Sequence, residues 1–169
     1  LHIQVTALDT EGMLRDADTL LSKVDPEVYV KVPVTMEGIK AIKQMKARGI
    51  HVTGTAIYGK QQGFLAMEAG ADYIAPYFNR MENMGLDSDD VIASLADMID
   101  LYHYDTQILA ASFKNAGQID RAFLAGAHTA TMDPSILKDV LTQPYITNAV
   151  DTFDSDWKTI FGDQTISEL

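Results

Sequence analysis

The sequence of 169 residues contains no cysteine. This absence excludes disulfide bonds, thiol catalysis and any metal site built on cysteine. Basic residues are also scarce, because 13 lysines and arginines stand against 24 aspartates and glutamates, for a formal net charge of −11. This surplus of negative charge argues against non-specific nucleic-acid binding, although a few local donors can still bind a phosphate.

Long apolar runs and targeting signals are missing as well. No stretch is apolar enough to span a bilayer, and no signal peptide or low-complexity linker is recognisable. We therefore expect a cytoplasmic protein that does not bind membranes. The four histidines lack the paired spacing of metal ligands, so the sequence predicts no metal site.

What the chain does contain is a regular alternation of short β-type runs and amphipathic helical segments. Strands are predicted at 1–5, 29–35, 51–57, 72–78, 107–112 and 128–132. Helices are predicted at 10–23, 36–48, 61–69, 88–102 and 115–125, and Asp133-Pro134 is typical of a further helix start. Residues 79–85 are predicted to form an irregular loop. The helix 88–102 is expected to bury Val91, Ile92, Leu95, Met98, Ile99 and Tyr102.

The alternation predicts an α/β fold with a parallel sheet. An open, doubly wound sheet would more often carry a glycine-rich phosphate loop after its first strand, and none is visible here. Short connections that end in glycine favour a barrel instead. Six strands are visible, whereas a (β/α)8 TIM barrel has eight. We therefore predict a TIM barrel whose first two βα units are missing from this chain, with residues 1–144 as units three to eight.

Residues 145–169 form a separate segment with a predicted amphipathic helix over 145–161. It carries the only tryptophan, Trp157, together with Phe153 and Phe161. Such a helix commonly covers the bottom of its own barrel. The large aromatic groups favour the alternative, in which it packs on a neighbouring subunit.

One candidate catalytic residue lies inside an apolar strand, in the run Tyr29-Val30-Lys31-Val32-Pro33-Val34-Thr35. Because strand residues alternate between two faces, Lys31 is expected on the face opposite to the valines. If that face is covered, loss of hydration favours the neutral amine, which can attack a carbonyl and form a Schiff base. Alternatively, Lys31 lies on an edge strand, where its charge prevents aggregation.

Further polar residues occur where the predicted strands end. In parallel α/β barrels the reactive groups stand at these carboxyl ends. Each residue alone also has a structural explanation, such as satisfying a backbone group. Their coincidence at matching strand ends favours a functional site. The residues are Gln4, Lys31, Thr55, Tyr77, Arg80, Ser112 and Lys114.

Four motifs resemble those of the transaldolase-like class I aldolases, and among these most closely the fructose 6-phosphate aldolases. The motifs are Val30-Lys31-Val32-Pro33-Val34-Thr35, Gly54-Thr55-Ala56-Ile57-Tyr58, Ala75-Pro76-Tyr77-Phe78-Asn79-Arg80 and Leu109-Ala110-Ala111-Ser112-Phe113-Lys114. Asp156-Trp157 and Phe161-Gly162 near the end of the chain also match, so the resemblance covers nearly the whole sequence.

The resemblance implies a role for each of these residues. Lys31 would form the Schiff base with the substrate. Gln4, Thr55 and Tyr77 would position the water that relays protons. Arg80 and Ser112 would hold the substrate phosphate, and we group Lys114 with them. Transaldolase-type members tend to have glutamate and phenylalanine in place of Gln4 and Tyr77, which favours an aldolase here.

The family's first two strands supply an aspartate acid/base, and a threonine and an asparagine near the lysine, that have no counterpart in this sequence. We interpret the chain as part of a longer protein. The resemblance implies a fructose 6-phosphate aldolase without a cofactor, acting on a sugar phosphate as a homo-oligomer, a pentamer or decamer. The alternatives are a transaldolase that transfers a dihydroxyacetone unit, and a non-catalytic phosphosugar-binding relative.

Overall fold

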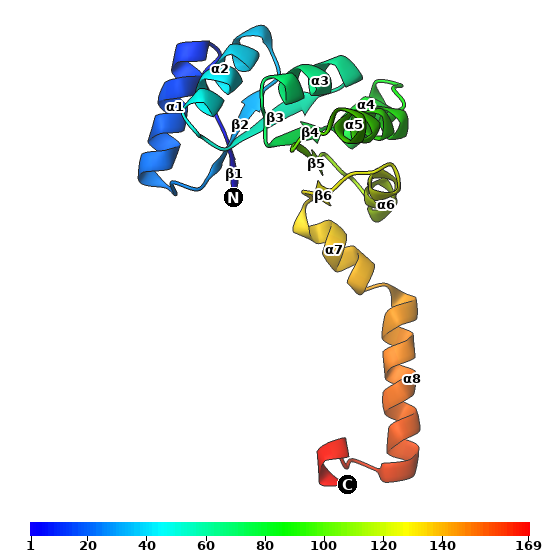
Figure 1. The fold of residues 1–169 in the computed structure, drawn as a ribbon. Coiled ribbons are helices and arrows are strands. Elements are labelled where there is room, and N and C mark those ends of the chain that lie inside the picture. Colours follow the sequence, from blue (N-terminus) through cyan, green and yellow to red (C-terminus); the bar gives the residue numbers. More distant parts are fainter. The chain divides into compact units, whose positions relative to one another are not determined.

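The computed structural model describes residues 1–169, which form two compact units, Leu1–Met132 and Asp133–Leu169. In the first unit, strands and helices alternate along the chain (Figure 1). The strands are β1 (His2–Gln4), β2 (Tyr29–Pro33), β3 (Val52–Ile57), β4 (Tyr73–Pro76), β5 (Gln107–Ala110) and β6 (Thr129–Ala130). The helices are α1 (Thr10–Lys23), α2 (Met36–Ala47), α3 (Lys60–Glu68), α4 (Phe78–Asn83), α5 (Ser88–Tyr102) and α6 (Ala116–Leu124).

The six strands form one sheet in the order β1-β2-β3-β4-β5-β6, and every neighbouring pair is parallel. This sequential order is typical of a barrel and is consistent with a partial TIM barrel. Strand β2 lies between β1 and β3, so the interpretation of Lys31 as an edge-strand residue is wrong.

Strand β2 alternates as predicted. Val30 and Val32 are fully buried, while Tyr29, Lys31 and Pro33 on the other face are half-buried. Helix α2 packs on this strand and contributes Ile42 and Met45, which are also fully buried. The hydrophobic core thus lies between the sheet and its helices, and it fixes Lys31 on the opposite face.

A very close approach of α2 fixes the carboxyl end of β2. The Thr35 hydroxyl accepts a hydrogen bond from the Gly38 N–H at 3.0 Å and caps the helix, as predicted. A Cβ atom at Gly38 would lie 1.8 Å from the Pro33 carbonyl oxygen. Only glycine therefore fits at this contact between helix and strand.

Most predicted elements are confirmed within one or two residues, but two expectations are wrong. Residues 79–85 were predicted to form a loop, and the structure has helix α4 over Phe78–Asn83 instead. Phe78 and Met81 are three positions apart, so they lie on one face of this short helix. Both are fully buried and pack that face into the core. Tyr102 was predicted to face the core, yet it is 59% exposed at the end of α5.

The second unit contains α7 (Pro134–Leu141), α8 (Pro144–Phe161) and a terminal 3-10 turn, Ile166–Glu168. Asp133 caps α7 in front of Pro134, as predicted. No residue of α8 is buried. The segment between α8 and this turn folds back on the helix, where the Trp157 indole N–H donates to the Gln164 carbonyl oxygen at 2.6 Å. No helix of either unit has the length and apolar character needed to cross a membrane.

Candidate active site

Lys31 occupies the middle of β2, in a row of side chains that crosses the sheet. The row follows from the strand register, in which Gln4 of β1 pairs with Lys31 and Lys31 pairs with Thr53 of β3. Register partners in a parallel sheet point to the same face. Gln4 and Lys31 are therefore neighbours on the face away from the helices, as predicted, although Gln4 is exposed and its amide donates to the Val5 carbonyl oxygen.

Below Lys31, at the amino-terminal end of the same face, lies an aromatic cluster. The His2 ring stacks on Tyr29 at 4.8 Å between centroids and meets Tyr73 edge-on at 5.1 Å. His2 Nδ1 also lies 2.8 Å from the Thr53 hydroxyl. Burial lowers the pKa of His2, and the positive charge of Lys31 lowers it further. A neutral His2 therefore leaves Lys31 without a second cation beside it at neutral pH.

Thr55 and Tyr77 meet at the carboxyl ends of β3 and β4. The Thr55 hydroxyl, which is buried, donates a hydrogen bond of 3.0 Å to the Tyr77 phenol oxygen. The backbone N–H of Tyr77 donates to the Ile57 carbonyl, which ties the two strand ends together. Two hydroxyl groups predicted to be neighbours are thus brought into direct contact, one row above Lys31.

Arg80 lies one turn further, in α4. Its guanidinium stacks over the Tyr77 ring at 4.7 Å, and Nη1 donates to the Tyr58 phenol oxygen at 3.3 Å. The pKa of Arg80 is raised, chiefly by the hydrogen bond to Tyr58. Tyr58, Arg80, Asn83 and Met84 line a cavity of about 410 Å³ beside the strand ends. The arrangement presents a permanent positive charge to an open cavity, which suits an anionic group.

Ser112 and Lys114 lie in the loop between β5 and α6. Ser112 adopts φ = 66°, a left-handed conformation that is unusual for a residue other than glycine. Its carbonyl oxygen accepts a hydrogen bond from the Asn79 N–H at 2.9 Å, so this loop is joined to the start of α4. The Lys114 side chain is exposed and contacts none of the other predicted site residues.

The structure therefore brings together Thr55, Tyr77 and Arg80 by direct contact and sets Gln4 beside Lys31 by strand register. Tyr58 was missed by the sequence reasoning, although it belongs to one of the quoted motifs and directly follows the predicted strand 51–57. Its contact with Arg80 depends on the fold. No group of three or more histidine, aspartate or glutamate side chains is placed to hold a metal ion.

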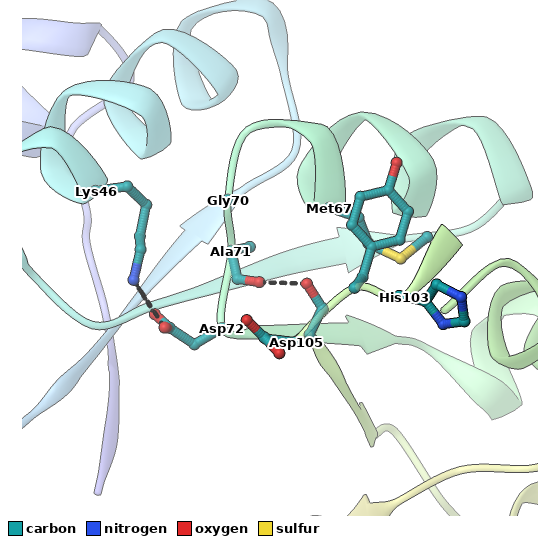
Figure 2. A pocket seen from close by; sticks show the side chains of 9 residues that line it. Lys46, Met67, Gly70, Ala71, Asp72, His103 and Asp105 are labelled. Carbon is teal, nitrogen blue, oxygen red and sulfur yellow. Dashed lines mark hydrogen bonds and ion pairs between the residues drawn. The ribbon is translucent and has the colours of Figure 1, made fainter. Parts of the chain in front are cut away.

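A second cavity, of about 390 Å³, lies at the opposite, amino-terminal ends of β4 and β5. Figure 2 shows the Lys46 amine pointing at Asp72, and the two form an ion pair of 2.7 Å. The Asp72 carboxylate also accepts a hydrogen bond from the Val52 N–H at 2.7 Å. These contacts tie α2 to the sheet, which is typical of the structural end of a barrel.

Comparison with known proteins identifies the family. A model described as Transaldolase/Fructose-6-phosphate aldolase matches residues 1–166. A protein of Streptococcus pneumoniae (strain ATCC 700669 / Spain 23F-1) named probable fructose-6-phosphate aldolase is 46% identical over 166 residues, which are 98% of this chain and 75% of the relative. A probable transaldolase of Chelativorans sp. (strain BNC1) is 38% identical over 154 residues, 91% of this chain and 70% of the relative. The chain belongs to the transaldolase/fructose-6-phosphate aldolase family.

Proposed function

We propose that this protein is a class I aldolase that interconverts fructose 6-phosphate with dihydroxyacetone and glyceraldehyde 3-phosphate. The observation that carries the proposal is the position of Lys31. It lies on an interior strand, opposite the core, on the face where the Thr55–Tyr77 hydrogen bond and Arg80 follow at the strand ends. An amine, a pair of hydroxyls and a guanidinium suit the carbonyl, hydroxyl and phosphate groups of a sugar phosphate.

The reaction begins with addition of the Lys31 amine to the C2 carbonyl of fructose 6-phosphate and loss of water, which gives a protonated imine. The C4 hydroxyl then gives up its proton through the water positioned by Gln4, Thr55 and Tyr77, and the same relay later returns a proton to C3 of the enamine. The C3–C4 bond breaks, its electron pair moves to the imine nitrogen as an enamine, and glyceraldehyde 3-phosphate leaves. Protonation of the enamine at C3 and hydrolysis release dihydroxyacetone. The imine is the electron sink, so this scheme uses no cofactor.

Arg80, Ser112 and Lys114 hold the phosphate in this proposal. Arg80 can donate two parallel hydrogen bonds to phosphate oxygens. Ser112 is held in its left-handed conformation at the end of β5, where it follows the strand beside β4. The exposed Lys114 adds a further positive charge.

Transfer of the dihydroxyacetone unit to a second aldose is the other candidate reaction, since one relative is named a probable transaldolase. Tyr77 favours the aldolase, because a phenol can pass a proton through the bound water and so release free dihydroxyacetone. Release of dihydroxyacetone from fructose 6-phosphate, measured against transfer to erythrose 4-phosphate, separates the two reactions.

Borohydride trapping tests the Schiff base directly. Reduction in the presence of fructose 6-phosphate should attach the substrate carbon skeleton to Lys31, as located by peptide mass spectrometry. Lys31→Met should abolish the adduct and turnover while the protein stays folded. Lys43→Met, at an exposed position on α2, is the matched control and should keep both. An undiminished adduct in Lys31→Met would refute the assignment.

We further propose that β1–β6 are units three to eight of a (β/α)8 barrel. The all-parallel sequential sheet and the coverage of 75% of a 46% identical relative support this proposal. The mass of the protein purified from its natural source tests it. A mass well above the 18.6 kDa of these 169 residues is expected.

A further inference from the structure

Gln118 of α6 is a buried polar side chain whose hydrogen bonds join two separate elements. It is 6% exposed. Its carbonyl oxygen accepts from the Lys114 N–H at 2.8 Å, in the loop that also carries Ser112. Its amide nitrogen donates to Asn79 Oδ1 at 3.0 Å and to Glu82 Oε2 at 2.5 Å, both on α4. Both protons of the amide are used, so the side chain has one fixed orientation.

The loop after β3 has the same local arrangement. Ala56, near the end of β3, and Ser112, in the β5–α6 loop, both adopt positive φ, at 57° and 66°. Two residues later the N–H of Tyr58 donates to Gln62 Oε1 at 2.9 Å, which is the bond that Lys114 makes with Gln118. Left-handed backbone is unfavourable for a residue other than glycine, so neighbouring contacts must hold it. In both loops a glutamine six residues after the strained position does so.

The two glutamines differ in where their amide protons go. Gln62 donates to the backbone carbonyls of Val34 and Ala56, both at 3.2 Å, and so serves only its own strand ends. Gln118 instead donates to side chains of α4, the helix that carries Arg80. Glu82 is also held by Arg121 at 2.6 Å, and Arg121 stacks over the Phe78 ring at 5.2 Å. Gln118 therefore sits between the loop of Ser112 and a well-supported face of α4.

We infer that Gln118 is a positioning residue for anion binding, which sets the Ser112–Lys114 loop against the helix that carries Arg80. The inference rests on the proposed function, in which these residues hold the substrate phosphate. The Ser112–Lys114 loop and helix α4 are separate elements, so a phosphate can contact both only when they lie at a fixed separation. A hydrogen bond at each end of one rigid carboxamide sets that separation.

Gln118→Glu tests the inference by removing the hydrogen bonds to α4 while keeping the bond to the Ser112–Lys114 loop. A carboxylate at position 118 still accepts from the Lys114 N–H, but it repels the Glu82 carboxylate and releases α4. KM for fructose 6-phosphate should rise about tenfold, the effect of losing one well-placed charged hydrogen bond. In the synthetic direction, KM for unphosphorylated glyceraldehyde should not change. Adding Glu82→Gln restores a donor opposite the new carboxylate and should recover most of the lost affinity.

Gln44→Glu, an identical change at an exposed position on α2, is the matched control and should behave as wild type. If Gln118→Glu does not fold, Gln118→Met supplies the test, because it removes the hydrogen bonds to the loop and to α4 without adding charge. Its KM for fructose 6-phosphate should rise and should not be recovered by Glu82→Gln. An unchanged KM in folded Gln118 variants, an equal rise for both aldehydes, or a double variant Gln118→Glu/Glu82→Gln that does not recover would overturn the inference.

The same variants separate this inference from the proposed function. If wild-type protein forms no borohydride adduct and does not cleave fructose 6-phosphate, the proposed reaction fails. The affinity for inorganic phosphate, titrated by NMR, then decides the role of Gln118 alone. Weaker phosphate binding in Gln118→Glu with recovery in the double variant supports it, and equal binding in all variants refutes it.

Discussion

Arg80 is held from two sides by neighbouring side chains. Its guanidinium lies over the Tyr77 ring and donates to the Tyr58 phenol. A side chain as long as arginine loses much rotamer freedom when it binds a ligand, and the two tyrosines restrict that freedom in advance. Tyr58 and Tyr77 thus favour one orientation of the fork-shaped donor.

Replacing Arg80 with alanine should separate phosphate recognition from the carbonyl chemistry. KM for fructose 6-phosphate should rise about 10- to 100-fold, because a charged, bidentate contact is lost. Synthesis from dihydroxyacetone and unphosphorylated glyceraldehyde should hardly change. Steady-state kinetics with both aldehydes measure the difference, and Arg15→Ala on α1 is the control. A similar loss with both aldehydes would show that Arg80 serves the fold or the chemistry instead.

The candidate site was only partly predictable from sequence. Strand-end reasoning identified Thr55, Tyr77 and Arg80, because the carboxyl ends of parallel strands meet at one edge whatever the details of packing. It did not identify Tyr58 or Gln118. Both residues follow left-handed backbone, at Ala56 and Ser112, where the sequence offers no glycine to indicate it.

Among the elements, the junction of β2 and α2 is the tightest. Gly38→Ala would push a methyl group against the Pro33 carbonyl oxygen, which neither the strand nor the helix can easily move. We expect a loss of about 1–3 kcal/mol in the free energy of unfolding, measured with denaturant.

Gly117→Ala is the matched control for this change. Gly117 also lies in the first turn of a helix, and a Cβ atom there would be 3.3 Å from the nearest atom, the side-chain oxygen of Asn115. Its replacement should cost clearly less than that of Gly38, because the nearest atom belongs to a side chain and alanine favours helix. Equal effects of the two substitutions would contradict the steric explanation.

Helices α1 and α2 are joined by a contact that depends on pH. Glu37 accepts hydrogen bonds from the Lys40 amine at 2.6 Å and from the Thr10 hydroxyl at 2.5 Å. These bonds, that of Lys40 above all, lower the pKa of Glu37 to about 2. A lowered carboxylate pKa stabilises the folded state above the ordinary pKa of about 4.3, and this contribution disappears as the pH falls toward 2.

Glu37→Gln should therefore lower the melting temperature most at neutral pH. The difference in melting temperature between wild type and variant should decrease steadily as the pH is lowered below about 4.3. Calorimetry of both proteins across this range measures this difference, with the exposed Glu11→Gln on α1 as control. A difference that stays constant down to acid pH would mean that the carboxylate contributes through packing and not through its charge.

Elements were easier to predict than site contacts, for a physical reason. The apolar periodicity of α1, α2 and α5 and the glycines after the helices act locally, and the structure confirms these elements. Helix α4 was missed because only Phe78 and Met81 anchor it, and such a short segment carries no repeating pattern. Tyr102 was misplaced because helical spacing does not show where the last turn of α5 passes beyond the core.

At the scale of the whole molecule, we propose that α8 packs on a neighbouring subunit of a homo-oligomer. Within the second unit none of its residues is buried, and Phe153 is 68% exposed. Deleting residues 145–169 should give a smaller species by light scattering, with the Lys31 borohydride adduct retained. Phe153→Asp should weaken assembly in the same direction. A truncated protein of unchanged subunit number would show that the helix has another role.

Trp157, the only tryptophan of the chain, lies in the second compact unit, while all the tyrosines except Tyr145 lie in the first. Its indole is held between the Phe161 ring, at 4.4 Å, and the Gln164 carbonyl. Tryptophan fluorescence therefore reports the state of the C-terminal unit, to which these contacts belong. Tyrosine emission reports mainly the sheet, so one unlabelled sample provides a separate optical signal for each unit.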